Sequence, residues 1–490
     1  MARIPRLGFR DDRWWAVGFV LFGAGGLLRG LATTYADADL WMHVRAGLDL
    51  WQAGRLPRHD PYSYLSGQTW INHTWLFDLV AGGLFDAGGA AALTWGRLAI
   101  VFGLAGLVWH AWRRAGWPVL PATLAAAVTM VACSPGLRTL RPQLLSYLLF
   151  AALLLILRRR HPRAMVAVVP VFVVWANVHG SVLLAVAAAA AWLLASIADR
   201  RCLPRWWDAG VIGLAALATL ATPYGTDLWR FLLANVGPRL DLAEWQPIAL
   251  PSVMGAVWLA AIAVGAVVVV RARERITPGL AAIWLLTAAL PWLAERHLPY
   301  FVLVSALVVL PHVSREPDAD VATEGRARRR LGQAAAAIGL ALALAALPAT
   351  STVVVEGHRV PEGAVDWLRR QGARGRMVVP FDWGGYVIWH LGPQLRVSMD
   401  SRRETVYSFD VLRAHEALEA GLASPILDGR PDFVLCMVDS PLMQRLAGDL
   451  SWRLAYRDTT SAVWIDADDT SRPARPHVET TARPARVAFP

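Results

Sequence analysis

The sequence predicts an α-helical membrane protein that crosses the bilayer about eleven times and carries a small extracytoplasmic α/β domain at its C-terminal end. Of its 490 residues, 56% are hydrophobic and 17% are charged, and the mean hydropathy of +0.40 is too high for a water-soluble chain of this length. Apolar runs of about 20 residues, long enough to span a bilayer, recur between Trp15 and Pro348. After Pro361 the pattern changes to short alternating helical and strand-like segments.

The first apolar run, Ala16 to Ala32, is predicted to remain in the protein as a membrane anchor. It is long for the core of a signal peptide, and no cleavage site of small residues precedes a soluble domain. We therefore count it as the first span.

The basic residues, which give a formal net charge of +11, indicate membrane topology. They form short clusters at the ends of apolar runs and not one patch with interleaved aromatic residues, which argues against nucleic acid as a partner. Arginine collects on the cytoplasmic side of membrane proteins. The clusters are Arg3/Arg6/Arg10/Arg13, Arg113/Arg114, Arg158/Arg159/Arg160/Arg163, Arg200/Arg201/Arg205, Arg271/Arg273/Arg275 and Arg326/Arg328/Arg329/Arg330.

Placing every arginine cluster in the cytoplasm sets the predicted spans and their direction. The N-terminus then lies inside and the C-terminal domain outside, in the cytoplasmic (inner) membrane of a bacterium. Trp75 to Phe85 must then be a helix on the membrane surface, because a span there would move each later cluster to the wrong side; its short apolar length and two aspartates favour this. The predicted spans are 15–32, 96–112, 118–134, 143–157, 164–178, 180–198, 209–222, 251–270, 279–294, 298–312 and 331–348.

Three regions follow from this pattern. Residues 1–349 form a transmembrane domain with a long first outer loop at 33–95, residues 350–466 form the α/β domain, and residues 467–490 form a disordered tail rich in Asp, Thr, Arg and Pro. The α/β domain should contain helices near 364–371 and 411–420 and strands at MVVPF, LRVSMD, DFVLCMV, LAYRD and SAVWI. The cysteines are odd in number and far apart, so we interpret them as packing residues: Cys133, Cys202 and Cys436.

Ionisable side chains gather on the predicted outer side of the membrane. Such groups are costly near a bilayer, so their concentration on one face suggests a functional site. Each also has a structural interpretation as a cap, an ion pair or an interfacial hydrogen-bonding group. The residues are Asp37, Asp39, His43, Asp60, His73, Arg138, Arg141, His179, Glu244, Glu295, Arg296 and His297.

Asp39 is the strongest catalytic candidate, because it closely follows the first span and precedes His43 by four residues, which places both on one face of a helix. A carboxylate there can take a proton from a hydroxyl that attacks an anomeric carbon. Asp37 is a second candidate for the base, a metal ligand or a helix cap. Asp37, Asp39 and His43, with Asp60 or His73, are also candidates for binding a divalent cation such as Mg²⁺ or Mn²⁺.

Three arginines, Arg138, Arg141 and Arg296, stand at outer span ends, where the positive-inside tendency disfavours them. A guanidinium fits phosphate oxygens well, so we predict that these residues bind a lipid phosphate. The alternatives are contact with lipid headgroups or pairing with Glu244 or Glu295. His73, His179, Glu244 and His297 complete the predicted substrate-binding set.

The segment DADLWMHVRAGLDLWQAGRLP, followed by NHTW, resembles the first outer loop of GT-C glycosyltransferases, including protein mannosyltransferases and aminoarabinose transferases. In that family an acidic pair follows the first span, an aromatic or polar residue comes four positions later, and a glycine stands about fifteen positions on. Asp39, His43 and Gly54 keep this spacing, but Leu40 follows Asp39, so the acidic pair is Asp37 and Asp39. The motifs RPQLLSYLLF, WANVHGS, TPYGTDLW, EWQP, RHLPYF and WGGYVIWHLGPQLRVSMDSRRETVY are similar to those of a bacterial group of such proteins.

The resemblance implies transfer of a sugar, usually with inversion, from a polyprenyl-phosphate donor to a lipid, glycan or protein acceptor on the outer face. Asp39 would be the general base, and Arg141 or Arg296 would hold the donor phosphate. The WGGY motif at Trp383 to Tyr386 would bind an acceptor or close over the membrane site. A tight turn at Gly384-Gly385 is the interpretation we favour for it.

Two other functions fit the same pattern. A transporter or flippase of lipid-linked glycans would need a polar pocket between spans, yet here the polar residues gather at outer span ends. A non-catalytic scaffold would use the outer domain to recruit partners. Purified protein given a polyprenyl-phosphate sugar separates these hypotheses: released lipid phosphate means transfer, sugar that reaches the opposite leaflet means flipping, and neither means a scaffold. We predict that Asp39→Asn abolishes the release and leaves folding intact.

Overall fold

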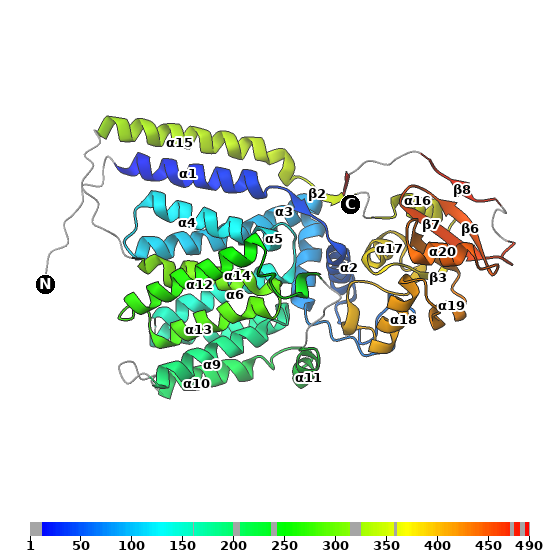
Figure 1. Cartoon of the computed structure of the whole chain (residues 1–490), viewed down its shortest axis with the longest axis horizontal. Coiled ribbons are helices and arrows are strands. Elements are labelled where there is room, and N and C mark those ends of the chain that lie inside the picture. Colours follow the sequence, from blue (N-terminus) through cyan, green and yellow to red (C-terminus); the bar gives the residue numbers. More distant parts are fainter. Residues whose placement is uncertain are drawn as a thin grey trace. The chain divides into compact units, whose positions relative to one another are not determined.

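The computed structural model describes residues 12–159, 161–198, 206–236, 243–313, 325–356, 360–470, 475–480 and 486–489. Contacts between residues divide the chain into two units, whose elements are labelled in Figure 1. The helical unit comprises Met1–Thr34 and Thr94–Ser351, and the sheet unit comprises Tyr35–Leu93 and Thr352–Pro490. The first outer loop thus belongs with the C-terminal domain, which differs from the predicted boundary at 349.

The helical unit is a bundle of apolar helices, and each predicted span coincides with a helical segment. Within the described residues, five helices are long and apolar enough to cross a membrane, and five shorter ones are similarly apolar. The main helices are α1 (Asp12–Leu31), the second part of α3 (Trp75–Arg114), α4 (Val119–Ala132), α6 (Pro142–Arg159), α8 (Val168–Val178), α9 (Val182–Ala198), α10 (Trp206–Ala218), α12 (Val253–Arg271), α13 (Pro278–Ala289), α14 (Leu298–Val304) and α15 (Gly325–Ala346).

Short helices connect these elements. They are α5 (Ser134–Leu137), α7 (Pro162–Met165), α11 (Thr226–Ala234), η1 (Ala243–Trp245), η2 (Leu290–Trp292), η3 (Glu295–His297), η4 (Ser305–Val309), η5 (Leu310–His312) and η6 (Leu347–Thr350). The predicted span 298–312 is therefore α14 followed by η4, which is a π-helix, and η5.

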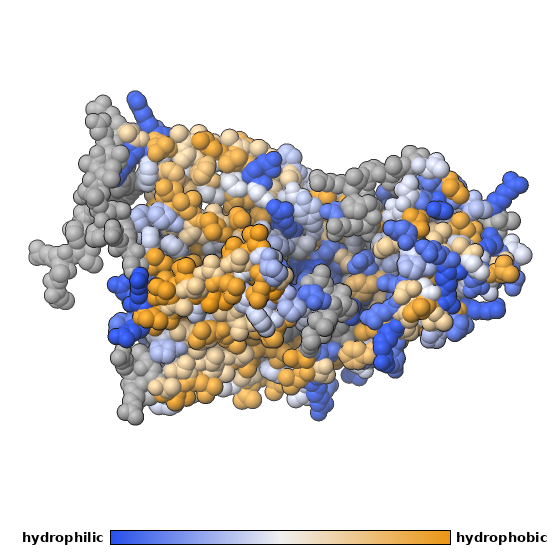
Figure 2. All heavy atoms as spheres, viewed as in Figure 1, coloured by the Kyte–Doolittle hydropathy of each residue, from blue (hydrophilic) through white to orange (hydrophobic). Residues whose placement is uncertain are grey.

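Helices α1 and α15 approach closely because glycines face each other across the contact. A Cβ atom on Gly18 would lie 2.0 Å from the carbonyl oxygen of Gly332, and one on Gly25 would lie 2.0 Å from that of Gly339. Small residues of this kind let membrane helices pack backbone to backbone. Figure 2 shows mostly hydrophobic residues on the face of the helical unit that is in view, as expected for a surface in contact with lipid.

The sheet unit is built on a six-stranded sheet in the order β4-β3-β5-β7-β6-β8. Strand β3 is parallel to β4 and β5, β7 is antiparallel to β5 and β6, and β8 is parallel to β6. Its strands are β3 (Gly375–Val378), β4 (Leu395–Val397), β5 (Phe433–Met437), β6 (Trp452–Arg457), β7 (Ser461–Asp466) and β8 (His477–Val478).

The other elements of the sheet unit are mostly helices. They are α2 (Ala38–Ala53), the first part of α3, α16 (Glu362–Arg370), η8 (Phe381–Trp383), α17 (Gly384–Leu391), η9 (Arg403–Thr405), α18 (Phe409–Glu419), α19 (Pro425–Asp428) and α20 (Pro441–Ala447). A second sheet, in the order β1-β2-β9, includes β1 (Thr34–Tyr35), which spans the boundary between the units, and pairs β2 (Val353–Glu356) antiparallel with β9 (Arg486–Ala488). One core cluster includes Leu418, Val434, Cys436 and Leu446.

The predicted fold class, a polytopic helical membrane protein with a small C-terminal sheet domain, is confirmed. The predicted elements of that domain all appear within a few residues of their expected positions. The tail differs, because β8 and β9 form within residues 467–490, which we predicted to be disordered. Cys133 and Cys436 are buried free thiols, and Cys202 lies outside the described residues.

Gly384 and Gly385 do not form the tight turn that we favoured. They begin helix α17, and Gly384 has helical φ and ψ of −55° and −48°. A Cβ atom on Gly384 would lie 2.0 Å from the carbonyl oxygen of Met399, and one on Gly385 would lie 2.9 Å from that of Ala38. The two glycines therefore permit close packing of α17 against neighbouring backbone.

Helix α3 is interrupted, which separates the predicted surface helix from the span after it. Gly88 and Gly89 have non-helical dihedral angles, and Gly89 has a φ of +58°, which favours glycine. The piece from Trp75 up to this break belongs to the sheet unit, whereas the helix from Thr94 onward belongs to the helical unit.

Candidate functional site

Helix α2 begins at the candidate acidic pair, and the two aspartates have different environments. Asp37 is the N-cap: its Oδ1 accepts a hydrogen bond from the backbone N–H of Leu40 at 3.0 Å. Such a cap satisfies one of the open N–H groups of the first turn. Asp39 lies in that first turn and is partly exposed. The structure therefore gives Asp37 the role of helix cap, which the sequence left open, and makes Asp39 the second residue of α2.

His43 lies one turn after Asp39 and pairs with Asp78 of α3. The Nδ1 atom of His43 is 2.6 Å from Oδ1 of Asp78, and the Asp78 carboxylate is 4% exposed. Its second oxygen accepts a hydrogen bond from the Asn72 amide at 2.7 Å, and the Thr74 hydroxyl donates to Oδ1 at 3.3 Å. Asp78 is thus held by several donors and in turn orients the His43 ring.

Two glycines explain why these helices meet at this point. A Cβ atom on Gly47 would lie 1.9 Å from the carbonyl oxygen of Asp78, and one on Gly82 would lie 2.5 Å from the carbonyl carbon of Gly47. The glycines let the two backbones touch, and each stands four residues after one partner of the ion pair, Gly47 after His43 and Gly82 after Asp78. One helical turn therefore relates the glycine contact to the His43–Asp78 pair.

The carboxylates around His43 favour its charged form. Burial lowers the pKa of His43, but Asp78, followed by Asp39 and Asp37, outweighs burial and raises that pKa above its ordinary value. The start of α2 is therefore a small acidic centre with one imidazole cation. A carboxylate there can accept a proton, and the imidazolium partly balances its charge.

The structure does not test the hypothesis of a metal ion at the start of α2. Within the described residues, no group of three or more His, Cys, Asp or Glu side chains is arranged to hold a metal ion. Asp37 is engaged as a cap, and His43 uses Nδ1 toward Asp78. Asp60 is also engaged: its two oxygens accept the backbone N–H groups of Tyr62 and Ser63, each at 3.0 Å. A cation at Asp37, Asp39 and His43 stays a prediction, and we derive no step from it.

Arg402, within the MDSRRE motif, joins the first outer loop to the C-terminal domain. Its guanidinium bonds Asp60 at 2.7 Å and Asp400 at 2.6 Å, and both carboxylates are fully buried. Burial raises the pKa of Asp400, but Arg402 outweighs this effect and holds that pKa below its ordinary value. The Asp400 carboxylate also accepts the Tyr407 hydroxyl at 2.8 Å. A buried pair with this many hydrogen bonds fixes the loop in one position.

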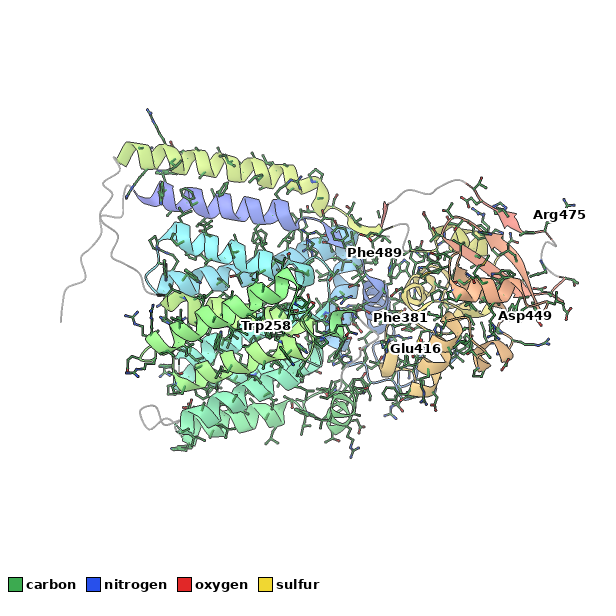
Figure 3. All side chains as sticks on the ribbon, viewed as in Figure 1. Trp258, Phe381, Glu416, Asp449, Arg475 and Phe489 are labelled. Carbon is green, nitrogen blue, oxygen red and sulfur yellow. The ribbon has the colours of Figure 1, made fainter. Side chains whose placement is uncertain are left out.

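Aromatic contacts hold the start of α2 against α17 and against Phe489, the residue after β9. Trp41 packs against Tyr386 and Phe489, with ring centroids 5.0 and 4.3 Å away; Phe489 is labelled in Figure 3. The Ser401 hydroxyl lies 3.4 Å from the carbonyl oxygen of Ala38. The WGGY and MDSRRE motifs thus contact the turn that carries Asp39.

In the helical unit, Arg141 and Arg296 share one carboxylate. Each places Nη1 3.0 Å from an oxygen of Glu244. The Arg296 guanidinium also lies over the Trp245 ring, 4.5 Å from its centroid. Two guanidinium groups thus share one carboxylate, and Glu244 is still 44% exposed. The pairing with Glu244 that the sequence left open is present.

The other predicted binding residues have mainly local partners. The Nδ1 atom of His179 is 2.7 Å from the Ser181 hydroxyl and 3.1 Å from that of Ser146. Burial and then Arg296 lower the pKa of His297 to about 4, so this imidazole is neutral near pH 7. Arg138 is exposed at the end of α5, and His73 lies in the turn before α3.

Sequence reasoning missed two residues that contact candidate site residues, Asp78 beside His43 and Arg402 beside Asp60. Asp78 was used only as one of the two aspartates that favour a helix on the membrane surface. A signal was present, because Asp78 precedes Gly82 by four residues, as His43 precedes Gly47. Arg402 was noted only as part of a motif. Its partner Asp60 lies 342 residues away in sequence, and such distant pairing gives no local periodic signal.

Comparison with known protein families finds no matching model, and comparison with curated protein sequences finds no match. Solved structures do match. The apo oligosaccharyltransferase of Archaeoglobus fulgidus is 11% identical over 94% of this chain and 75% of its own, with a TM-score of 0.56. Apo ArnT from Cupriavidus metallidurans is 15% identical over 91% of this chain and 97% of its own, with a TM-score of 0.53. These proteins are GT-C-type glycosyltransferases, so the chain has a GT-C-like fold.

Proposed function

We propose that this chain is a membrane glycosyltransferase that transfers a sugar from a polyprenyl-phosphate donor to a lipid, glycan or protein acceptor. The reaction takes place on the outer face of a bacterial cytoplasmic membrane, with inversion at the anomeric carbon. The observation that carries this proposal is the acidic centre at the start of α2, with Asp39 beside a capping Asp37 and the His43–Asp78 pair. The GT-C-like fold supports the class of reaction.

Asp39 acts as the general base. Its carboxylate takes the proton of an acceptor hydroxyl while that oxygen forms a bond to the anomeric carbon. The bond from that carbon to the donor phosphate breaks, and polyprenyl phosphate leaves with the electron pair. The cap at Asp37 holds the helical turn that carries Asp39, and Asp78 orients the His43 imidazolium next to it.

The leaving phosphate gains negative charge as the bond breaks, so a cation that contacts it stabilises the transition state. Arg141 and Arg296 supply such cations in the helical unit. Glu244 positions both guanidinium groups by pairing with them. It also lowers the net charge around the phosphate, which favours release of polyprenyl phosphate after transfer. Arg138 and His297 belong to the same proposed substrate-binding set.

The test follows a radiolabelled sugar. Membranes containing the full chain, from a host that supplies lipid, glycan and protein acceptors, receive short-chain polyprenyl phosphates that carry different labelled sugars. The wild type should move label into a new product and release polyprenyl phosphate. Asp39→Asn should lower the rate by about 10²- to 10⁴-fold, the contribution of a general base. Asp227→Asn, at an exposed residue of α11, is the matched control and should not change the rate.

The outcomes separate the three functions. Label in a new product with release of lipid phosphate supports transfer. Movement of unchanged donor to the opposite leaflet would mean a flippase, and neither result with any donor would mean a scaffold. Full turnover by Asp39→Asn would remove Asp39 from the role of base.

A further inference from the structure

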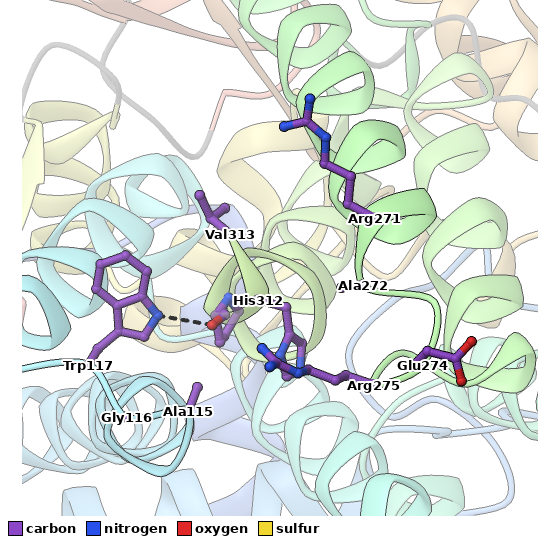
Figure 4. Close-up of a pocket in the computed structure, with 10 residues that line it drawn as sticks. Ala115, Gly116, Trp117, Arg271, Ala272, Glu274, Arg275, His312 and Val313 are labelled. Atoms are coloured by element: carbon purple, nitrogen blue, oxygen red, sulfur yellow. Dashed lines mark hydrogen bonds between the residues drawn. The ribbon is translucent and has the colours of Figure 1, made fainter. Parts of the chain in front are cut away.

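A cavity of about 480 Å³ lies in the helical unit where the ends of three helical segments meet (Figure 4). It is lined by residues 115–117 after α3, by residues 271, 272, 274 and 275 at and after the end of α12, and by residues 311–313 at the end of η5. Its volume falls within the range of roughly 300–1,000 Å³ of small-molecule sites. None of the residues assigned to glycosyl transfer lines it, so the cavity needs a different explanation.

Among the described residues, basic side chains outnumber acidic ones in the lining of the cavity. Arg271 and Arg275 line it, and the lining Glu274 has a carboxylate oxygen 3.8 Å from Nε of Arg273. A further guanidinium adjoins the wall, because Nη2 of Arg158 lies 3.4 Å from Nε2 of the lining His312. The local charge therefore favours an anion.

Hydrogen bonds within and beside the lining segments hold the walls in place. The indole N–H of Trp117 donates to the carbonyl oxygen of Pro311 at 2.9 Å, as Figure 4 shows. The Arg113 guanidinium donates to the carbonyl oxygen of Trp117 at 2.6 Å, and that of Arg158 donates to the carbonyl oxygen of Leu307 at 3.0 Å. These hydrogen bonds hold the walls of the cavity in a defined geometry, which lowers the ordering cost of binding.

Exposed apolar side chains lie along α12, the helix whose last residue lines the cavity. Val264, Val267 and Val270 are 52%, 49% and 69% exposed, and Val270 directly precedes Arg271. Exposed valines on a helix long and apolar enough to span a membrane face lipid chains. A ligand of this site therefore meets guanidinium groups at one end and an acyl-chain environment beside them, which favours an amphiphile over a free anion.

We propose that this cavity binds the phosphate headgroup of an anionic phospholipid, with Arg271 and Arg275 as its cationic ligands and the valine face of α12 as the contact for its acyl chain. Basic pockets between membrane helices suit such headgroups. This site is separate from the acidic centre of α2 and does not depend on glycosyl transfer.

The test measures lipid binding to the full chain in a mild detergent by native mass spectrometry, with phosphatidylglycerol and phosphatidylcholine of identical acyl chains. The wild type should prefer phosphatidylglycerol. Arg271→Gln/Arg275→Gln should weaken its binding by about 30-fold, since each arginine near an anionic lipid contributes about a five-fold factor. Glu274→Gln, at an exposed side chain, should tighten binding because it removes a negative charge from the wall.

The matched control is Arg329→Gln/Arg330→Gln, which removes the same charge from exposed arginines of α15 that do not line the cavity. It should leave binding within about two-fold of wild type. Equal loss in both double variants would overturn the proposal, as would wild-type binding by Arg271→Gln/Arg275→Gln. Inorganic phosphate is the competing ligand: displacement of the lipid at equal concentration would show that the site takes free phosphate and would overturn the lipid assignment. Glu274→Gln keeps the test valid if the double variant fails to fold.

Discussion

Nδ1 of His43 lies 2.6 Å from Oδ1 of Asp78, which joins α2 to the first turn of α3 beside Asp39. The two helices can approach this closely because Gly47 and Gly82 meet one turn further along. The ion pair and the glycine contact are therefore one structural feature, and the acidic centre depends on both.

Asp78→Asn should destabilise the protein and do so most at low pH. The raised pKa of His43 means that its pairing contributes stability fully below the unfolded pKa of about 6.5 and loses it as pH rises through the folded value. Removing the partner should cost about 1–3 kcal/mol near pH 5.5 and less near pH 8.5. Thermal unfolding of the purified chain at both pH values measures this difference. Asp86→Asn, at an exposed residue of the same helix, is the control, and a difference that grows with pH would contradict the assignment.

Gly47→Ala should separate α2 from α3, because the new Cβ atom would meet the carbonyl oxygen of Asp78 at 1.9 Å. Overpacking of this kind costs about 1–3 kcal/mol, and loss of the His43–Asp78 bond should lower the transfer rate. Gly67→Ala adds the same methyl group where nothing lies within 4 Å and should change neither property. Labelled-sugar transfer and thermal unfolding are measured on both variants. Wild-type behaviour of Gly47→Ala would show that the helix contact does not control the acidic centre.

Two substitutions at Asp37 distinguish a cap from a catalytic group. Asp37→Asn keeps an N-cap side chain and should retain most of the transfer rate, whereas Asp37→Ala should cost about 0.5–2 kcal/mol of stability. The rate and the unfolding temperature are compared for the two variants. If Asp37→Asn lost as much activity as Asp39→Asn while remaining folded, Asp37 would have a direct catalytic role.

Arg296→Gln should weaken use of the donor. Loss of a charged hydrogen bond to phosphate costs about 1.5–3 kcal/mol, or about 10- to 150-fold in kcat/KM for the polyprenyl-phosphate sugar. Arg296→Lys should recover part of this loss, because it keeps the charge but not the planar fork. Arg230→Gln, at an exposed residue of the same unit, is the control. An unchanged kcat/KM for the donor in Arg296→Gln would remove Arg296 from the phosphate site.

Short-range sequence patterns predicted the helices and the strands and singled out Asp37 and Asp39 as the candidate acidic pair. These features depend on neighbours within a few residues. The spans, the helix after Asp37 and strands such as Phe433–Met437 all follow from short-range patterns of apolar and polar residues. Asp39 stood out for the same reason, since its spacing from the first span and from His43 is local.

Contacts between distant residues were decided only by the tertiary structure. The union of the first outer loop with the C-terminal domain depends on Arg402, which reaches Asp60 across 342 residues, and on the packing of Trp41 against Phe489. The role of Gly384 is likewise a matter of backbone approach, because glycine in sequence marks a turn and a close contact equally well. Burial and ion pairing of this kind depend on which surfaces pack together in the folded chain. Patterns among neighbouring residues do not specify that packing.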